Sequence, residues 1–351
     1  MPKLCQYSLL YALLSLILFG NSLSFSWGQD ASTEEATPEQ TAHVREKAQE
    51  IYARLDKNNP ESVELTLSRL EQLYERFPAN QEARCELREK FAQLRPLAAH
   101  NENPENAGVW KVAAFIIRST DFSWEQNGEQ KEFQASFTEA EIERIKRGME
   151  GFANFVWDFS DGWLRIEWTC EVVEKSLTKF DAIGETYWSG PVGMGDVLPE
   201  IPMNSTDSIM TFVKTGGVHT PEEKTDAIPL YSFGAALPEW NPYTHGATYI
   251  TFHWETNSAI TEPDGEPMMH EWCHSLQWAL ENRRHYPLGL AGNPDGGRFV
   301  GEERSPEEAD PCYHRDPAKE KSWIELYRHI LQTHTTRNML KGAAERDDFR
   351  K

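Results

Sequence analysis

The chain has 351 residues, of which 39% are hydrophobic and 26% are charged, a composition typical of a globular protein with one substantial domain and room for a smaller one. The formal net charge is -21, and this argues against a nucleic-acid partner because phosphate binding depends on clustered Lys and Arg.

The first 28 residues have the layout of a secretory signal peptide. Lys3 precedes an apolar run, LLYALLSLILFG, and small residues lead to a cleavage site near Gly28. We predict a secreted or periplasmic mature protein; the alternative is a membrane anchor formed by an uncleaved N-terminal segment. No later stretch is long and apolar enough to cross a membrane, so we expect no stable membrane insertion after cleavage.

Cleavage would leave four cysteines: Cys85, Cys170, Cys273 and Cys312. Two disulfides are possible in an oxidising compartment, and the sequence does not choose among the three connectivities.

A short helical region is expected at the start of the mature chain. Residues 29–43 are polar and contain proline, which predicts a flexible lead. Residues 44–100 then carry apolar sets at helical spacing, interrupted by KNNPES and RFPANQEA. The stretch YERFPANQEA resembles a single tetratricopeptide unit, and a lone unit cannot bury its faces without a neighbour. We therefore predict a helical hairpin that caps the main domain; the alternative is a peptide-binding repeat array.

Residues 109–351 are predicted to form the main domain, of α+β class with one mixed sheet. The continuous apolar run 109–119 indicates a central strand. Thr138 with Glu141 three residues later predicts a capping box at the start of a helix. Further strands are expected at 161–173, 207–216 and 246–255, whereas 180–206 and 217–245 are rich in Gly and Pro and are expected to be loops.

The next expected helix contains MMHEWCHSLQW, in which His270 and His274 are four residues apart and Glu271 follows the first histidine. On a helix this spacing separates the two Cβ atoms by about 5 to 6 Å, so both imidazoles can reach one metal ion. Glu271 would accept a proton from a zinc-bound water and pass it to a leaving amine, since zinc lowers the pKa of that water to about 7. The alternative is a metal-free core helix, because a five-residue pattern such as HEWCH also arises by chance.

The two faces of this helix differ in polarity. Gln277 and Glu281 share the face of the histidines, and the residues opposite are expected to pack on the core: Trp272, Leu276, Ala279 and Leu280.

The stretch HEWCHSL and the strand before it resemble the zincin metallopeptidases. The resemblance implies Zn2+ as the cofactor, His270 and His274 as ligands, Glu271 as the general base, and a peptide or protein substrate. It also implies that strand 246–255 forms the edge of the substrate cleft. Gln277 and Leu280 stand where metzincins have Gly and His, so that subfamily is disfavoured and no other is assigned.

The third zinc ligand has to come from further along the chain. His285 lies about 16 Å beyond His274 on a continuous helix, too far to share the ion. We predict His314 in the stretch DPCYH, because imidazole suits zinc, with Asp310 and Glu303 as alternatives.

Three further residues each have a predicted role and an alternative. Tyr313 is a candidate donor to the oxyanion of a tetrahedral intermediate, and packing at a loop edge is the alternative. Cys273 is expected in the core or in a disulfide with Cys312. His253 is expected to be an exposed strand histidine, or else to line the cleft.

These features together predict a secreted zinc-dependent hydrolase, a metallopeptidase in which Glu271 acts as general base. The alternative is a non-catalytic zincin-fold binding or scaffold protein with a vestigial or structural metal site. The oligomeric state cannot be derived from the sequence.

Overall fold

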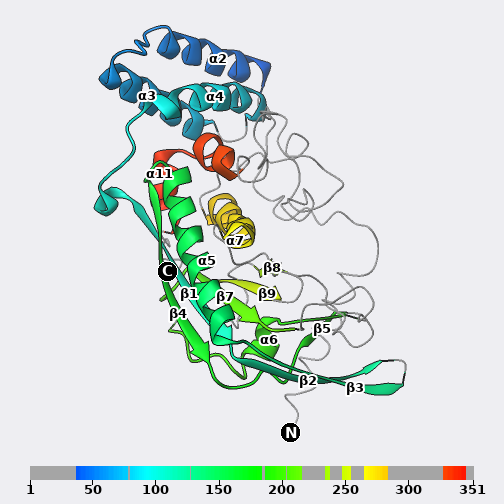
Figure 1. The fold of residues 1–351 in the computed structure, drawn as a ribbon. Coiled ribbons are helices and arrows are strands. Elements are labelled where there is room, and N and C mark those ends of the chain that lie inside the picture. Colours follow the sequence, from blue (N-terminus) through cyan, green and yellow to red (C-terminus); the bar gives the residue numbers. More distant parts are fainter. Residues whose placement is uncertain are drawn as a thin grey trace, which may run out of the picture.

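A mixed sheet with helices on both sides of its central strands forms the larger part of the molecule, and a helical cap lies at one end (Figure 1). The computed structural model describes these residues: 37–77, 80–126, 128–183, 186–202, 204–215, 234–237, 247–253, 265–283 and 327–344. The signal peptide predicted at residues 1–28 lies outside them.

The main sheet has five strands in the order β4-β1-β7-β9-β8. The four parallel strands are β1 (Gly108–Ile117), β4 (Leu164–Val173), β7 (Ser208–Val213) and β9 (Thr248–His253), and β8 (Gly234–Leu237) runs antiparallel to β9. Every residue of β7 and β9 is buried, because both faces of the sheet are covered. The predicted α+β class with one mixed sheet is therefore confirmed.

The strand predicted at 246–255 lies inside the sheet, and one edge of the sheet is formed by a strand that the sequence did not indicate. The predicted strand 246–255 is present as β9, which pairs with β7 on one side and with β8 on the other. The edge is β8, which lies in the stretch 217–245 that was predicted to be a loop. A four-residue strand made of Gly, Ala and Leu carries no alternating pattern that sequence could reveal.

Two hairpins also lie in stretches that gave no strand prediction. One consists of β2 (Ser119–Gln126) and β3 (Glu129–Ser136), and the other of β5 (Asp181–Ile183) and β6 (Thr186–Trp188). Gly128 takes a positive φ of 78° in the first hairpin, and the Asn-Gly dipeptide there is a hairpin signal. These hairpins and the short helix α6 (Pro191–Met194) pack on one face of the sheet around a core that includes Phe122, Phe180 and Met194.

The opposite face of the sheet is covered by α5 (Glu139–Phe159) and α7 (Glu266–Trp278). Thr138 caps α5, and its predicted capping box with Glu141 is confirmed. Trp272 of α7 lies with its ring centroid 5.8 Å from Trp110 of β1 and 5.8 Å from Phe152 of α5. Trp272, Leu276, Ala279 and Leu280 are fully buried, as predicted.

A glycine sets the close approach of these two helices. Gly265 precedes α7 with φ 61°, and a Cβ built there would lie 2.5 Å from the Gly148 carbonyl oxygen of α5. A side chain at this position would therefore separate α7 from α5.

The cap contains three helices, where the sequence predicted a hairpin: α2 (Pro38–Tyr52), α3 (Pro60–Arg76) and α4 (Gln81–Leu94). Short 3-10 turns follow at η1 (Arg95–Leu97) and η2 (Pro104–Asn106). The predicted flexible lead 29–43 is wrong from residue 38 onward, because Thr37 and Gln40 form a capping box that starts α2 there.

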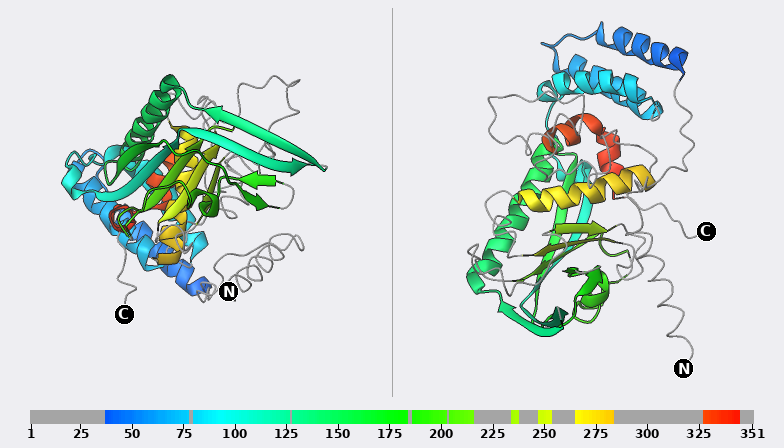
Figure 2. Two further views of the ribbon diagram at one scale, coloured as in Figure 1. Left: turned by 90° about the horizontal axis from the view of Figure 1, so that it is seen from below. Right: turned by 90° about the vertical axis from the view of Figure 1, so that its right-hand side faces the viewer.

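A C-terminal segment, residues 327–344, lies between the cap and α7, as the right-hand view of Figure 2 shows in red. It contains the π-helical turn η5 (Ile330–His334) and helix α11 (Arg337–Gly342). At its far end it touches β1, since a Cβ on Gly108 would lie 2.6 Å from the Leu340 carbonyl oxygen. The segment therefore joins the cap to the sheet domain.

The contact between the cap and the C-terminal segment combines apolar packing with buried charges. Glu71 of α3 accepts hydrogen bonds from Arg95 Nη2 at 2.9 Å and from Arg337 Nε at 2.8 Å. Arg95, whose side chain is 1% exposed, also reaches Asp161 at 3.3 Å and the Thr335 carbonyl at 3.2 Å. Because of these bonds, the inner face of the cap is occupied by contacts within the chain. This favours the predicted cap over the alternative of a peptide-binding repeat array.

Among the described residues, no helix has the length and apolar character that a membrane span requires. Cys85 forms a disulfide whose partner lies outside the described residues, and Cys170 and Cys273 carry thiols. The predicted disulfide between Cys273 and Cys312 is therefore wrong, and Cys273 is a buried core residue.

Candidate metal centre

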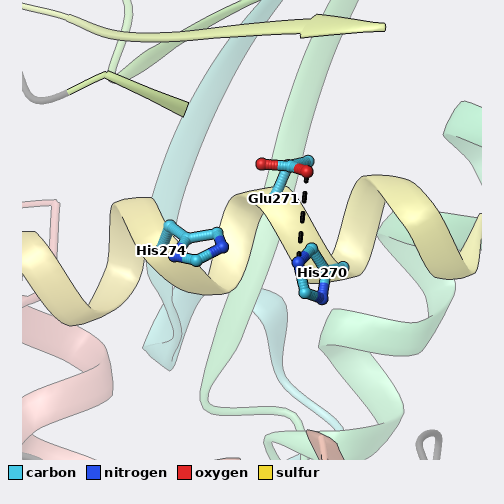
Figure 3. A group of neighbouring side chains, drawn as sticks. All are labelled: His270, Glu271 and His274. Carbon is cyan, nitrogen blue, oxygen red and sulfur yellow. Dashed lines mark ion pairs between the residues drawn. The ribbon is translucent and has the colours of Figure 1, made fainter. Parts of the chain in front are cut away.

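Helix α7 places the two histidines and the glutamate of the HEWCH stretch around one point. The ring centroids of His270 and His274 are 5.1 Å apart, and Nε2 of His270 lies 4.0 Å from Oε1 of Glu271. One ligand atom from each of the three residues lies within 4.8 Å of the others. Figure 3 shows the two imidazoles side by side along the helix, with Glu271 on the adjacent side.

The two imidazoles differ in their exposure. His270 and Glu271 are buried, at 8% and 6% exposed, and His274 is half-buried. Burial lowers the pKa of His270 well below its ordinary value, and the neighbouring His274 lowers it further. His270 is therefore neutral at physiological pH, which is the form that binds a metal ion.

The second nitrogen of His270 has a partner on the C-terminal segment. The hydroxyl of Tyr327 lies 3.1 Å from His270 Nδ1, and Tyr327 is buried at 1% exposed. The dashed line in Figure 3 joins the other nitrogen, Nε2, to Glu271, so the two nitrogens have different surroundings.

The histidine face of α7 continues through a buried glutamine. Gln277 Nε2 donates to Glu281 Oε1 at 2.9 Å, whereas Gln277 Oε1 is buried with no hydrogen-bond partner in the described part of the chain. Buried acceptors usually have a partner, so this oxygen departs from the usual pattern on the histidine face.

Immediately after α7 the chain makes a π-helical turn, η4 (Ala279–Arg283). Single π-turns are rare and are often found at functional sites. The segment that supplies Tyr327 contains a second one, η5, so both elements that meet at His270 carry such a turn.

Several predicted site residues lie outside the described residues: Glu303, Asp310, Tyr313 and His314. The predicted third ligand and oxyanion donor therefore remain predictions. In the described part of the chain, His270, Glu271 and His274 form the only cluster with the geometry of a metal site.

His253 was predicted to be exposed or to line the cleft, and this prediction is wrong. Its side chain is 1% exposed, and its Nε2 lies 2.8 Å from the Ser189 hydroxyl. Ser189 also contacts the Thr251 hydroxyl, and its carbonyl accepts a hydrogen bond from Tyr249 at 2.6 Å. Tyr249 belongs to the core on the face opposite α7, so this polar cluster attaches the β6 region to the back of the sheet.

Comparison with known proteins adds no family to this description: no protein-family model, no curated protein and no solved structure matches the chain.

Proposed function

We propose that the protein is a secreted zinc-dependent hydrolase of zincin type that acts on peptides or proteins, with Glu271 as general base. The observation that carries this proposal is the cluster of His270, Glu271 and His274, whose ligand atoms lie within 4.8 Å of one another. No other described group of His, Cys, Asp and Glu has this geometry.

The donor chemistry of the cluster fits zinc. Zinc is commonly bound by imidazole nitrogen and carboxylate oxygen, and His270 is held neutral by its burial. His270 and His274 would hold the ion, and His314 is the proposed third ligand. A bound zinc ion would supply Lewis acidity, which polarises a carbonyl group and acidifies water at neutral pH.

Glu271 is placed to transfer protons, whereas the two histidines would hold the ion. It follows His270 directly, so its carboxylate leaves the helix beside the imidazoles (Figure 3). There it would accept a proton from the water that attacks the substrate carbonyl, and return it to the leaving amine. Its burial at 6% exposed limits competing solvent around the carboxylate.

The position of β8 supports an extended peptide as substrate. β8 pairs with β9 and with no other described strand, and it lies next to α7 in the right-hand view of Figure 2. An edge strand presents unpaired backbone groups, to which an extended peptide can add by backbone hydrogen bonds. The same edge would bring a peptide bond close to the histidine face of α7.

The proposal is tested by replacing the base and leaving the ligands intact. Glu271→Gln should lower peptide hydrolysis at least about 100-fold and should keep bound zinc, because general-base catalysis contributes about 100- to 10,000-fold. The measurement is cleavage of a mixed peptide library, followed by mass spectrometry, alongside zinc analysis of the same samples.

Glu143→Gln is the matched control, since Glu143 lies on α5 with a side chain 57% exposed and pairs only with Lys146 among the described charges. It should cleave like the wild-type protein. Equal hydrolysis by Glu271→Gln and wild type would refute the general-base role. Zinc binding with no hydrolysis by any form would favour the non-catalytic scaffold protein.

A further inference from the structure

Tyr327 contacts the proposed metal centre from outside α7. Its hydroxyl lies 3.1 Å from His270 Nδ1, and the two ring centroids are 6.3 Å apart with planes at 69°. An edge contact of this kind, together with a hydrogen bond, restricts rotation of the imidazole about both of its side-chain torsions.

The position of the proton on the His270 ring decides which nitrogen can bind a metal ion. A neutral imidazole carries one proton, and the nitrogen without it is the one that can bind a metal ion. When Nδ1–H donates a hydrogen bond to an oxygen acceptor, Nε2 carries no proton and its lone pair is free. Nε2 is the nitrogen that lies 4.0 Å from Glu271 and faces the cluster (Figure 3).

We propose that Tyr327 is a positioning residue whose hydroxyl oxygen accepts a hydrogen bond from Nδ1–H of His270, fixing the ring so that Nε2 faces the metal site. This inference rests on the proposed function in one respect, that the ion is held by His270. It adds a residue from the C-terminal segment, more than fifty positions away, to the support of the site.

Contacts with the cap anchor the C-terminal segment a few residues after Tyr327. Tyr74 of α3 donates its hydroxyl to the His334 carbonyl at 3.2 Å, and Arg95 reaches the next carbonyl, that of Thr335. Arg337 pairs with Glu71 at 2.8 Å. The buried charges of the cap therefore fix the segment that supplies Tyr327, and the cap belongs to the support of the site.

The test is the zinc affinity of the full chain, measured by competition with a chromogenic chelator and with zinc ion as the only added ligand. Tyr327→Phe removes one hydroxyl and keeps the ring. We expect zinc to bind 10- to 100-fold more weakly, the usual effect of losing a partner of a metal-binding histidine.

Tyr74→Phe is the matched control, because it removes a buried hydroxyl that is bonded to the same segment but not to His270. Its zinc affinity should stay within twofold of the wild type. An unchanged affinity in Tyr327→Phe would overturn the proposal. An equal loss in both variants would also overturn it, since segment packing and not the hydroxyl would then be responsible.

A second measurement separates this inference from the proposed function. Nitrogen-15 NMR of the metal-free protein reports which nitrogen of His270 carries the proton. We expect protonated Nδ1 in the wild type and in Tyr74→Phe, and a mixture of tautomers in Tyr327→Phe. If the wild type binds no zinc, the proposed function fails, and the same spectra still decide the role of Tyr327: identical tautomers in all three proteins would refute it.

Discussion

The two large internal contacts of the protein differ in their content of buried charge. Helices α5 and α7 meet the sheet through apolar side chains, with Trp272 between Trp110 and Phe152. The cap meets the C-terminal segment through apolar packing together with a buried ion network around Glu71, Arg95 and Arg337. The first contact is stabilised mainly by apolar area removed from water, whereas the second also depends on each charged partner being present.

This difference has a consequence for the site. The apolar contact fixes the backbone of α7, and with it the direction of His270, Glu271 and His274. The ionic contact fixes the segment that brings Tyr327 to His270 Nδ1. The site is thus supported from two sides by interactions that should respond differently to substitution.

The largest effect is expected from breaking the ionic contact. Glu71→Gln leaves Arg95, at 1% exposed, without its closest carboxylate, and we expect a loss of about 3 to 5 kcal/mol in the free energy of unfolding. Urea denaturation measures this loss. Glu86→Gln is the control, because the Arg45–Glu86 pair is on the same cap but 37% and 40% exposed, and it should cost at most about 1 kcal/mol. Equal losses in both variants would contradict a buried ionic contact.

The apolar contact is tested by Ile145→Ala on α5. Ile145 is fully buried, so the change should leave a cavity and cost about 2 to 5 kcal/mol in the free energy of unfolding. Substituting the exposed Glu143 of the same helix by Ala should change it by no more than about 0.5 kcal/mol. A loss in Ile145→Ala no greater than that control would mean that α5 is not packed on the sheet.

A smaller effect is expected at the start of α5. Thr138 accepts a hydrogen bond from the Glu141 backbone N–H at 3.3 Å, and Thr138→Ala should cost about 1 kcal/mol in thermal or urea unfolding. Thr138→Ser keeps the hydroxyl and should restore nearly all of this stability. If the serine variant were as unstable as the alanine variant, the methyl group and not the cap would be responsible.

The smallest effect concerns pH. Burial raises the pKa of Glu141, but hydrogen bonds from Lys214 and from the Thr138 backbone outweigh it, and the net pKa is lowered. The stabilisation is therefore complete above the ordinary Glu pKa of about 4.3 and is lost as pH falls through the lowered pKa. Glu141→Gln should destabilise the protein by less than about 1 kcal/mol at pH 7 and remove this acid dependence. A pH profile of unfolding parallel to that of the wild type would contradict the assignment.

The apolar contact could be predicted from the sequence, because its signals are local. The run 109–119, the capping box at Thr138 and the helical spacing around HEWCH each gave the correct element within a few residues. The same spacing placed His270 and His274 on one face, since four residues complete about one turn.

The ionic contact could not be predicted, because its partners are far apart in the chain. Glu71 and Arg337 are separated by 266 positions, and charged residues in a helical pattern are normally expected to face solvent. The contact between Tyr327 and His270 could not be predicted for the same reason. In the sequence Tyr327 is one apolar position of a helical pattern, and only the fold brings it to His270. For His253 the prediction failed for a similar reason. The alternation of the strand suggested an exposed side chain, but the β6 region covers the residue.

The most direct test of the account is the zinc content of the purified protein, measured by mass spectrometry for wild type, His270→Ala, His274→Ala and His329→Ala. His329 is a control from the C-terminal segment, outside the cluster. We predict about one zinc ion per chain in the wild type and in His329→Ala, and its loss in the other two variants. A wild-type protein without zinc, or zinc retained in His270→Ala, would contradict the proposed metal centre.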